Sequence, residues 1–195
     1  KSIVITSTIP DEGKTVVASN LAITLGKVEK VLLIDADMRR PSLGEIYDIP
    51  KSAAGLSELV AKTSKPNECI RRISKDNIWL LPAGTTPSNP LELLSSKRFG
   101  DLLKALGKIF DRIIIDCAPT QPVSDSMVLS RLSDVVVYVI KADSTSYKLA
   151  QHGVKRMRSV DAPIIGVVLN ALNFKKAAQY HSSYDYYGYD YSQKS

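Results

Sequence analysis

Six short apolar runs of strand length recur along this chain of 195 residues, with helix-forming stretches between them. The runs are rich in Val and Ile, scarcely alternate with polar residues, and are bounded by turn-forming or acidic residues. Such runs are typical of parallel strands that are covered on both faces. The six runs are residues 3–6, 31–35, 78–81, 113–116, 135–140 and 164–170. We therefore expect a sheet whose strands are joined by right-handed crossovers.

The stretches between these runs predict the helices that make the crossovers. We expect helices over residues 14–27, 56–61, 91–95, 98–106, 125–132 and 147–160. Alternation of strands and helices is typical of an α/β fold in which helices cover both faces of the sheet. The sequence thus predicts a three-layer α/β sandwich with a mostly parallel central sheet.

Length and composition limit the chain to one globular unit with a distinct end. With 44% hydrophobic and 24% charged residues, a wholly disordered chain is excluded. The composition changes after Asn173, and six of the nine tyrosines fall in the last sixteen residues. We expect residues 1–173 to form one nucleotide-binding domain and residues 174–195 to form a flexible tyrosine-rich tail.

A loop suited to phosphate binding follows the first predicted strand. Residues Thr8–Thr15, TIPDEGKT, fit the P-loop pattern GxxxxGK(S/T) except that Thr8 replaces the leading glycine. Such a loop directs backbone N–H groups at a polyphosphate, helped by the positive end of the helix that follows. Lys14 would reach the outer phosphates, and the Thr15 hydroxyl would bind Mg²⁺.

Three aspartates follow predicted strands. Asp35 and Asp37 end the second strand, and Asp116 ends the run over residues 113–116. Open α/β sheets bind ligands at the carboxyl edge of their strands, so these acids and Lys14 are expected to converge there. The P-loop and the acids together predict a site for a magnesium nucleotide, either ATP or GTP.

The chain resembles the bacterial tyrosine kinases (BY-kinases), the cytoplasmic autokinases of exopolysaccharide and capsule production. The resemblance rests on residues 6–15 as Walker A, residues 35–41 (DADMRRP) as an additional Walker A′ motif, and residues 116–119 (DCAP) as Walker B. Residues 81–84 (LPAG), residues 89–94 (NPLELL) and the terminal tyrosine cluster also resemble the family. The resemblance implies a P-loop NTPase fold of the deviant-Walker kind.

The resemblance implies a role for each site residue with ATP and Mg²⁺ as cofactors. Lys14 and the backbone of residues 11–16, which are Asp11, Glu12, Gly13, Lys14, Thr15 and Val16, bind the β- and γ-phosphates. Thr15, Asp37 and Asp116 hold the metal, directly or through water. Asp35 is the expected base that accepts the proton of a tyrosine hydroxyl. Arg39 is expected at the γ-phosphate or a neighbouring subunit, and Asn170 at the nucleotide base or as a strand-end cap.

The terminal tyrosines are the phosphate acceptors that the resemblance implies. They are Tyr180, Tyr184, Tyr186, Tyr187, Tyr189 and Tyr191. The alternative is an aromatic low-complexity terminus without this role. If the last strand is parallel to the first, the tail starts near the phosphate loop.

The family also implies partners and a location. It implies a homo-oligomer, either open or closed into a ring, a transmembrane polysaccharide chain-length regulator that is fused or separate, and a tyrosine phosphatase. The sequence begins at Lys1 directly on an apolar strand, with no initiator Met, so we expect it to be part of a longer polypeptide. No apolar run reaches the roughly 18 residues that span a bilayer. Two cysteines cannot form a disulfide framework. We expect a cytoplasmic location at the inner face of the plasma membrane.

Two other functions remain open. One is a non-kinase deviant-Walker switch ATPase, although such proteins carry a lysine directly after the first P-loop position, where this chain has Ile9. The other is an ATP-dependent module that regulates a membrane polysaccharide machine by docking alone. Nucleic-acid binding is not expected, because the basic pairs behind the net charge of +6 are dispersed and match no known motif.

Overall fold

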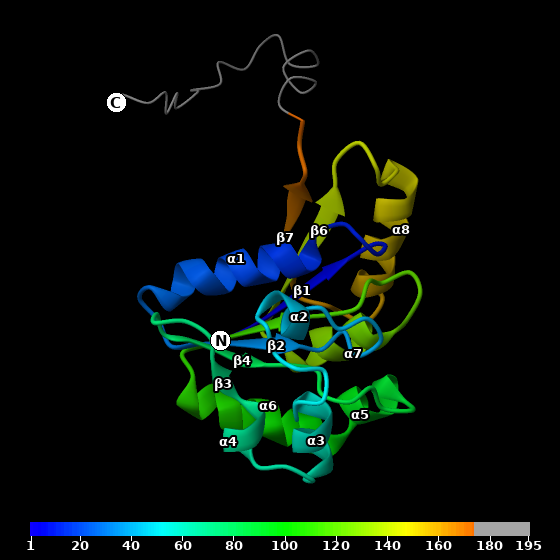
Figure 1. The fold of residues 1–195 in the computed structure, drawn as a ribbon. Coiled ribbons are helices and arrows are strands. Elements are labelled where there is room, and N and C mark those ends of the chain that lie inside the picture. The colour runs from blue at the N-terminus through cyan, green and yellow to red at the C-terminus, as the bar shows by residue number, and fades with distance from the viewer. Residues whose placement is uncertain (174–195) are drawn as a thin grey trace, which may run out of the picture.

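A seven-stranded sheet forms the centre of the computed structural model, which describes residues 1–173 (Figure 1). The strands are β1 (Ser2–Ser7), β2 (Val31–Asp35), β3 (Arg71–Arg72), β4 (Ile78–Leu81), β5 (Arg112–Asp116), β6 (Val135–Lys141) and β7 (Ile164–Asn170). Their order in the sheet is β3-β4-β2-β5-β1-β6-β7. All neighbours are parallel except β3 and β4, which are antiparallel. The predicted mostly parallel sheet is confirmed.

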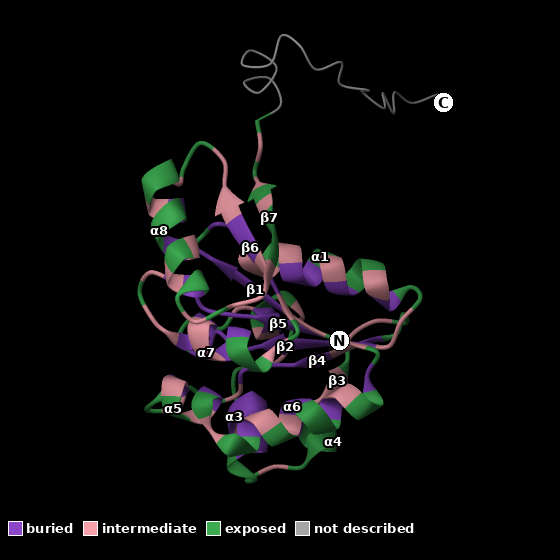
Figure 2. Ribbon diagram, turned by 180° about the vertical axis from the view of Figure 1, so that it is seen from behind, coloured by how far each residue is buried: buried purple, intermediate pink, exposed green. Residues whose placement is uncertain are grey.

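Helices cover the two faces of the sheet unequally. They are α1 (Lys14–Gly26), α2 (Leu43–Ile46), α3 (Leu56–Ala61), α4 (Pro66–Cys69), α5 (Pro90–Ser95), α6 (Lys97–Ile109), α7 (Asp125–Leu132) and α8 (Tyr147–Arg158). One core cluster joins α1 and α2 to one face, and a larger cluster joins α3, α5, α6, α7 and α8 to the other. Figure 2 shows the buried strands between these layers. The protein is thus the three-layer sandwich that the sequence predicts.

The strand register brings the acidic strand ends together. Asp35 at the end of β2 pairs with Asp116 at the end of β5. Strand β1 lies on the other side of β5, and its carboxyl end leads into the phosphate loop. Because parallel strands end at one edge, the topology places the phosphate loop and both acids at the same edge.

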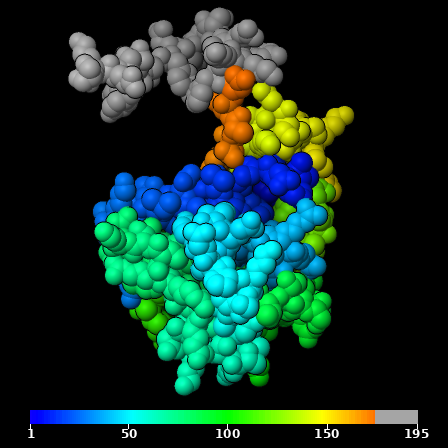
Figure 3. All heavy atoms as spheres, in the orientation of Figure 1, coloured from blue at the N-terminus to red at the C-terminus, as the bar shows by residue number. Residues whose placement is uncertain are grey.

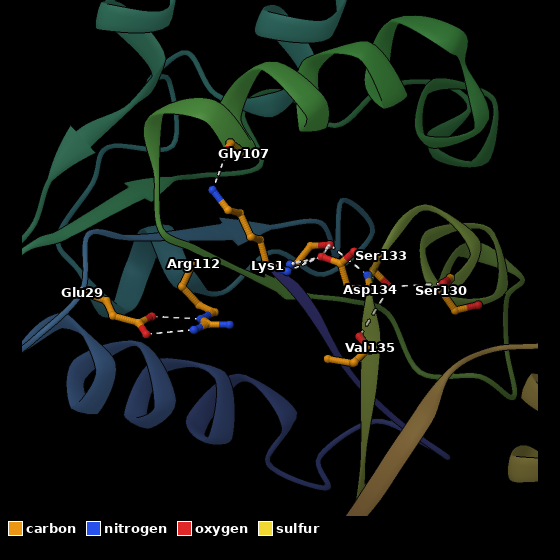
Figure 4. A network of polar contacts seen from close by, with 9 residues as sticks. Lys1, Glu29, Gly107, Arg112, Ser130, Ser133, Asp134 and Val135 are labelled. Atoms are coloured by element: carbon orange, nitrogen blue, oxygen red, sulfur yellow. Dashed lines mark hydrogen bonds and ion pairs between the residues drawn. The ribbon is translucent and has the colours of Figure 1, made fainter.

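Polar contacts tie the strands together at the opposite edge (Figure 4). The Arg112 guanidinium donates to both carboxylate oxygens of Glu29, at 2.9 and 2.8 Å. Asp134 accepts a hydrogen bond from the Ser2 backbone N–H at 2.7 Å. These contacts fix where β1, β5 and β6 begin, and therefore where they end at the site.

The sequence prediction fails at short elements and at one sheet edge. Strand β3 and helices α2 and α4 were not expected, because two or four residues carry too little periodicity. The sequence also predicts that both faces of every strand are covered, but one face of β7 is exposed. Ile165, Val167 and Leu169 are each more than half exposed, since β7 ends the sheet and no helix of residues 1–173 covers them. Among the described residues, no helix has the length and hydropathy needed to cross a membrane.

Candidate active site

The phosphate loop connects β1 to α1 and has the backbone shape of a P-loop. Gly13 has φ +87°, and α1 begins at the next residue, Lys14. A Cβ on Gly13 would lie 2.0 Å from Nδ2 of Asn170, so only glycine fits both the conformation and the space. Asp11 is also left-handed, with φ 64°. Asp adopts this conformation more readily than most residues.

Thr8 stands where the P-loop pattern has its first glycine, and the structure shows why a threonine is accepted. Thr8 is not among the residues with positive φ, so its backbone does not require glycine. The buried Tyr138 hydroxyl on β6 donates to the Thr8 hydroxyl at 3.2 Å and lies 2.8 Å from the Thr120 hydroxyl. Thr8 therefore links the loop to two neighbouring segments.

The Glu12 side chain stabilises the phosphate loop, a role that the sequence alone does not indicate. One carboxylate oxygen accepts from the backbone N–H groups of Thr8 and Ile9, the latter at 2.8 Å. The other accepts from the Lys141 N–H at 3.1 Å and from the Thr145 hydroxyl. Glu12 is only 1% exposed. It therefore connects the phosphate loop to the segment between β6 and α8.

Lys14 lies among the predicted acids. Its Nζ is 3.0 Å from Oδ2 of Asp37 and 3.9 Å from Oδ1 of Asp116. Burial alone would lower the pKa of the Lys14 ammonium, but the carboxylates of Asp116 and Asp37 outweigh burial and raise that pKa. The Thr15 hydroxyl donates to Oδ2 of Asp116 at 2.6 Å. The structure thus brings Lys14, Thr15, Asp37 and Asp116 together.

Asp35 and Asp116 are carboxyl groups that titrate close to neutral pH. Burial and the neighbouring Asp116 raise the pKa of Asp35 to about 7. Burial also raises the pKa of Asp116, to about 6, although Lys14 opposes the shift. Oδ2 of Asp35 accepts from the N–H groups of Ser42 and Leu43 at 3.1 and 3.0 Å, whereas its Oδ1 has no hydrogen-bond partner among the described residues.

Two cavities adjoin these residues. The first, of about 380 Å³, is lined by Gly13, Lys14, Thr15, Asp37, Arg39, Ser42 and the loop after β5. The second, of about 430 Å³, is lined by Asp35 with Pro41, Gly44, Ile49, Ala53 and Pro82. In Figure 3 the cyan segment that contains α2 lies across the front of the molecule below α1. Asp37 thus faces the phosphate-loop cavity, and Asp35 borders the second cavity.

The oxygen groups at the first cavity fit a magnesium ion held together with phosphates. Mg²⁺ binds through one or two protein oxygens and completes its shell with waters and phosphate oxygens. The Thr15 hydroxyl and the Asp116 carboxylate are adjacent, and Oδ1 of Asp116 is buried without a hydrogen-bond partner in the described part of the chain. Within residues 1–173 no cluster of three or more His, Cys, Asp or Glu side chains forms a metal site by itself. Asp37 and Asp116 are therefore better placed to act with Thr15 and a nucleotide than as an isolated metal cage.

Arg39 forms an ion pair with Asp125. Its Nε and Nη2 donate to the two carboxylate oxygens of Asp125, at 2.9 and 3.3 Å. The cap residue of α7 is Ser124, and Asp125, the first residue of this helix, binds Arg39 through its buried carboxylate. The sequence does not indicate this pair, because the two residues are 86 positions apart.

The remaining predicted residues are placed as follows. The Asn170 amide donates to the Glu12 carbonyl at 2.9 Å, so the end of β7 supports the phosphate loop. Val16, in the first turn of α1, is 54% exposed. The six terminal tyrosines lie outside the described residues.

Known proteins are similar to this chain in sequence and in fold. Residues 1–165 match the family described as AAA domain. The chain is 33% identical over 191 residues to a protein named putative tyrosine-protein kinase CapB of Staphylococcus aureus, covering 97% of this chain and 82% of CapB. It belongs to the bacterial tyrosine kinase family. Tyrosine-protein kinase YwqD of Bacillus subtilis is 32% identical, with 96% of this chain and 78% of YwqD covered.

Solved BY-kinase structures have the same fold. The kinase domain of VpsO superposes with a TM-score of 0.85 at 38% identity, covering 88% of this chain and 85% of VpsO. The kinase domain of Escherichia coli tyrosine kinase ETK gives 0.81 at 32% identity, covering 87% and 66%. The septum site-determining protein MinD of Pyrococcus horikoshii, solved with Mg-ADP, shares the fold with a TM-score of 0.71 at 22% identity, covering 87% and 69%. The predicted deviant-Walker P-loop fold is thereby confirmed, and family membership implies a nucleotide site.

Proposed function

We propose that the protein is an ATP-dependent tyrosine autokinase that phosphorylates its own terminal tyrosines. The observation that carries this proposal is the grouping of Lys14, Thr15 and Asp37 around the phosphate-loop cavity, with Asp35 at an adjoining cavity. The named relatives CapB and YwqD are tyrosine-protein kinases, which supports the same activity here.

Phosphoryl transfer requires mainly positioning and charge neutralisation. Lys14 and the backbone N–H groups of residues 11–16 bind the outer phosphates. Thr15, Asp37 and Asp116 hold Mg²⁺, which neutralises phosphate charge when it is bound. The Glu12 carboxylate keeps the loop in shape through its contacts with Ile9 and Lys141. Asn170, at the end of β7, supports the phosphate loop through its hydrogen bond to the Glu12 carbonyl.

Asp35 accepts the proton of the tyrosine hydroxyl. A general base works best when its pKa is near the working pH, and burial raises the pKa of Asp35 to about 7. Its Oδ1 has no hydrogen-bond partner within residues 1–173 and can accept a hydrogen bond from the tyrosine hydroxyl. Asp35 has no exposed surface, so the segment of Ser42 and Leu43 that covers it shifts when the acceptor enters from the second cavity.

The acceptors are the tyrosines of residues 174–195, which form a tail behind the kinase domain of residues 1–173. Strand β7 is parallel to β6 and β1, and Asn170 at its end contacts the phosphate loop. The eight residue steps from Ala178 to Tyr186 span about 26 Å when extended, at roughly 3.3 Å per residue. That reach serves either the chain's own site or that of a neighbouring subunit.

The polysaccharide role brings partners with it. The chimerical protein CapA2B2 matches this chain with a TM-score of 0.85 at 33% identity, covering 88% of this chain and 76% of the chimera. This chimera carries a CapA part together with a CapB part, which supports a CapA-type membrane regulator of chain length as the partner. The chain is also 32% identical to tyrosine-protein kinase wzc of Salmonella typhimurium and covers 27% of its length, which suits a kinase fused to further segments. We further propose a homo-oligomer that is open or closed into a ring, a tyrosine phosphatase that removes its phosphates, and a location at the inner face of the plasma membrane.

The decisive experiment follows radioactive phosphate from γ-labelled ATP. The autokinase retains label as phosphotyrosine in residues 174–195, and Lys14→Met abolishes the label. Lys27→Met, at an exposed position beyond α1, is the matched control and keeps the activity. Release of free phosphate without protein label would instead identify a switch ATPase. Nucleotide binding with neither label nor release would identify a docking module.

The route of the acceptor has its own test. Ala53 lines the second cavity but not the first. Ala53→Phe should fill that cavity and lower tyrosine phosphorylation at least tenfold, while Mg·ADP affinity measured by calorimetry stays within about twofold. Unchanged phosphorylation in a folded Ala53→Phe protein would contradict entry through this cavity.

A further inference from the structure

Arg39 enters the phosphate-loop cavity while it is bound to a carboxylate behind it. It lines the same cavity as Lys14 and Thr15, and its side chain is 40% exposed. The Asp125 side chain is 0% exposed and accepts from Nε and Nη2 of Arg39. One edge of the guanidinium is therefore occupied by a buried acid, and the other edge is open.

A guanidinium has five N–H donors in a fixed plane, and its geometry matches carboxylates and phosphates. The contact with Asp125 uses two of these donors on the Nε side. The donors on Nη1 and the second donor on Nη2 remain for another anion. Because the guanidinium is planar, fixing one edge on Asp125 also fixes the direction of the other edge.

We propose that Asp125 is a positioning residue that aims the free edge of Arg39 at the terminal phosphate of the bound nucleotide. The inference rests on the proposed function, because it takes the cavity as the site of the triphosphate. It adds a residue on α7 to a site otherwise built from the phosphate loop and the ends of β2 and β5. Asp125 acts only through Arg39 and does not touch the nucleotide.

The position of Asp125 suits this role. It is the first residue of α7, directly after the loop in which Ala118, Pro119, Pro122 and Val123 line the same cavity. The pair thus connects this loop to the segment after β2. Asp125 is buried whereas Arg39 is partly exposed, so the carboxylate is the fixed partner and the arginine is the one it orients.

The test compares a nucleotide that has the terminal phosphate with one that lacks it. Calorimetry gives the affinities of the whole chain for Mg·ADP and for a non-hydrolysable Mg·ATP analogue, and their ratio isolates the contacts of the terminal phosphate. We expect the wild-type protein to prefer the triphosphate and Arg39→Ala to lose about tenfold of that preference, as removal of a charge-assisted hydrogen bond implies. Asp125→Asn should lose a similar factor although Arg39 is intact, and Mg·ADP affinity should stay within about twofold.

The double variant Arg39→Ala/Asp125→Asn shows whether Asp125 acts by positioning Arg39 or by stabilising the site independently of Arg39. If Asp125 acts through Arg39, the double variant loses no more triphosphate preference than Arg39→Ala alone. Additive losses, or an unchanged preference in Asp125→Asn, would overturn the proposal.

The Arg39→Lys variant tests the proposal without any substitution at the buried Asp125. Lysine keeps the charge but lacks a second edge, so we expect it to lose about as much triphosphate preference as Arg39→Ala. Retention of the full preference in Arg39→Lys would show that charge alone is required and would also overturn the proposal. These readouts need no phosphoryl transfer, so a chain that binds nucleotide as described but leaves its tyrosines unlabelled would contradict only the proposed function.

Discussion

The Asp35 carboxyl group shows how one buried residue couples stability to function. Its pKa is raised to about 7 by burial and by Asp116, whereas an unfolded chain has an Asp pKa of about 3.9. The folded protein therefore binds the proton more tightly than the unfolded chain. Its stability rises as pH falls from about 7 to about 4, and at higher pH the ionised group costs the nucleotide-free protein stability.

We predict that Asp35→Asn stabilises the nucleotide-free protein at pH 8 by about 1–3 kcal/mol, because it removes a buried charge. The free energy of unfolding in urea, measured at pH 5 and pH 8, checks this. The variant should also show a smaller stability difference between the two pH values than the wild-type protein. Asp101→Asn, at an exposed position on α6, is the control and should leave the pH dependence unchanged. A loss of stability at pH 8 in Asp35→Asn would contradict the ionised, buried state of this group.

At Thr8 we predict that restoring the glycine of the general P-loop pattern weakens the protein. Thr8→Gly removes the hydroxyl bound by Tyr138 and frees the backbone of the unfolded chain, at a cost of about 1–2 kcal/mol. Thr8→Ser keeps the hydroxyl and should remain within about 0.5 kcal/mol of wild type. Thermal unfolding of the two variants measures the difference. Equal stability of Thr8→Gly and wild type would show that the hydroxyl contact contributes nothing.

At the scale of elements, Glu12 joins the phosphate loop to the segment that links β6 to α8. The Glu12 carboxylate accepts from two N–H groups of the loop, from Lys141 N–H and from Thr145. Glutamine at this position would place an NH₂ group against donors on one side. We predict that Glu12→Gln lowers the free energy of unfolding by about 2–3 kcal/mol and weakens Mg·ADP binding, because buried donors lose their acceptor.

Asp11→Asn is the matched control for Glu12→Gln. It removes one negative charge from the same loop at an exposed position and keeps a residue that adopts left-handed backbone. Urea unfolding and calorimetry of the two variants should separate the effect of the lost charge from the effect of the lost contacts with Lys141 and Thr145. Equal effects of both substitutions would assign the change to charge and not to the contacts with Lys141 and Thr145.

Several elements of the fold can be predicted from the sequence alone. The runs over residues 31–35, 78–81 and 164–170 coincide with β2, β4 and β7, because buried strands carry a dense β-branched signal. The acids at strand ends follow from the same pattern. Two sets of contacts cannot be predicted in this way: the ion pair between Arg39 and Asp125, and the hydrogen bonds of Glu12 with Lys141 and Thr145. Both join segments that meet only after the sheet has assembled, so no local spacing in the sequence indicates these contacts.

At the scale of the whole molecule, the sheet order determines where the tail leaves the domain. Strand β7 is an edge strand, yet its last residue, Asn170, reaches the carbonyl of Glu12 in the phosphate loop. Residues 174–195 therefore follow a strand that ends at the site. The chain carries a net charge of +6, and its terminal segment holds six tyrosines.

We predict that phosphorylation of the tail weakens self-association of the protein. Each phosphotyrosine adds about −1.5 to −2 charges, so six of them add about −9 to −12 and reverse the sign of the whole chain. Anionic tails repel one another and are repelled by the nucleotide phosphates at the site, so they should leave the sites that they entered. Sedimentation velocity of fully phosphorylated protein should give a smaller mass than that of unphosphorylated Lys14→Met, and high salt should reduce the difference. A variant with all six tyrosines changed to phenylalanine should not dissociate when it is incubated with Mg·ATP. An unchanged mass after phosphorylation would mean that the tail charge does not control assembly.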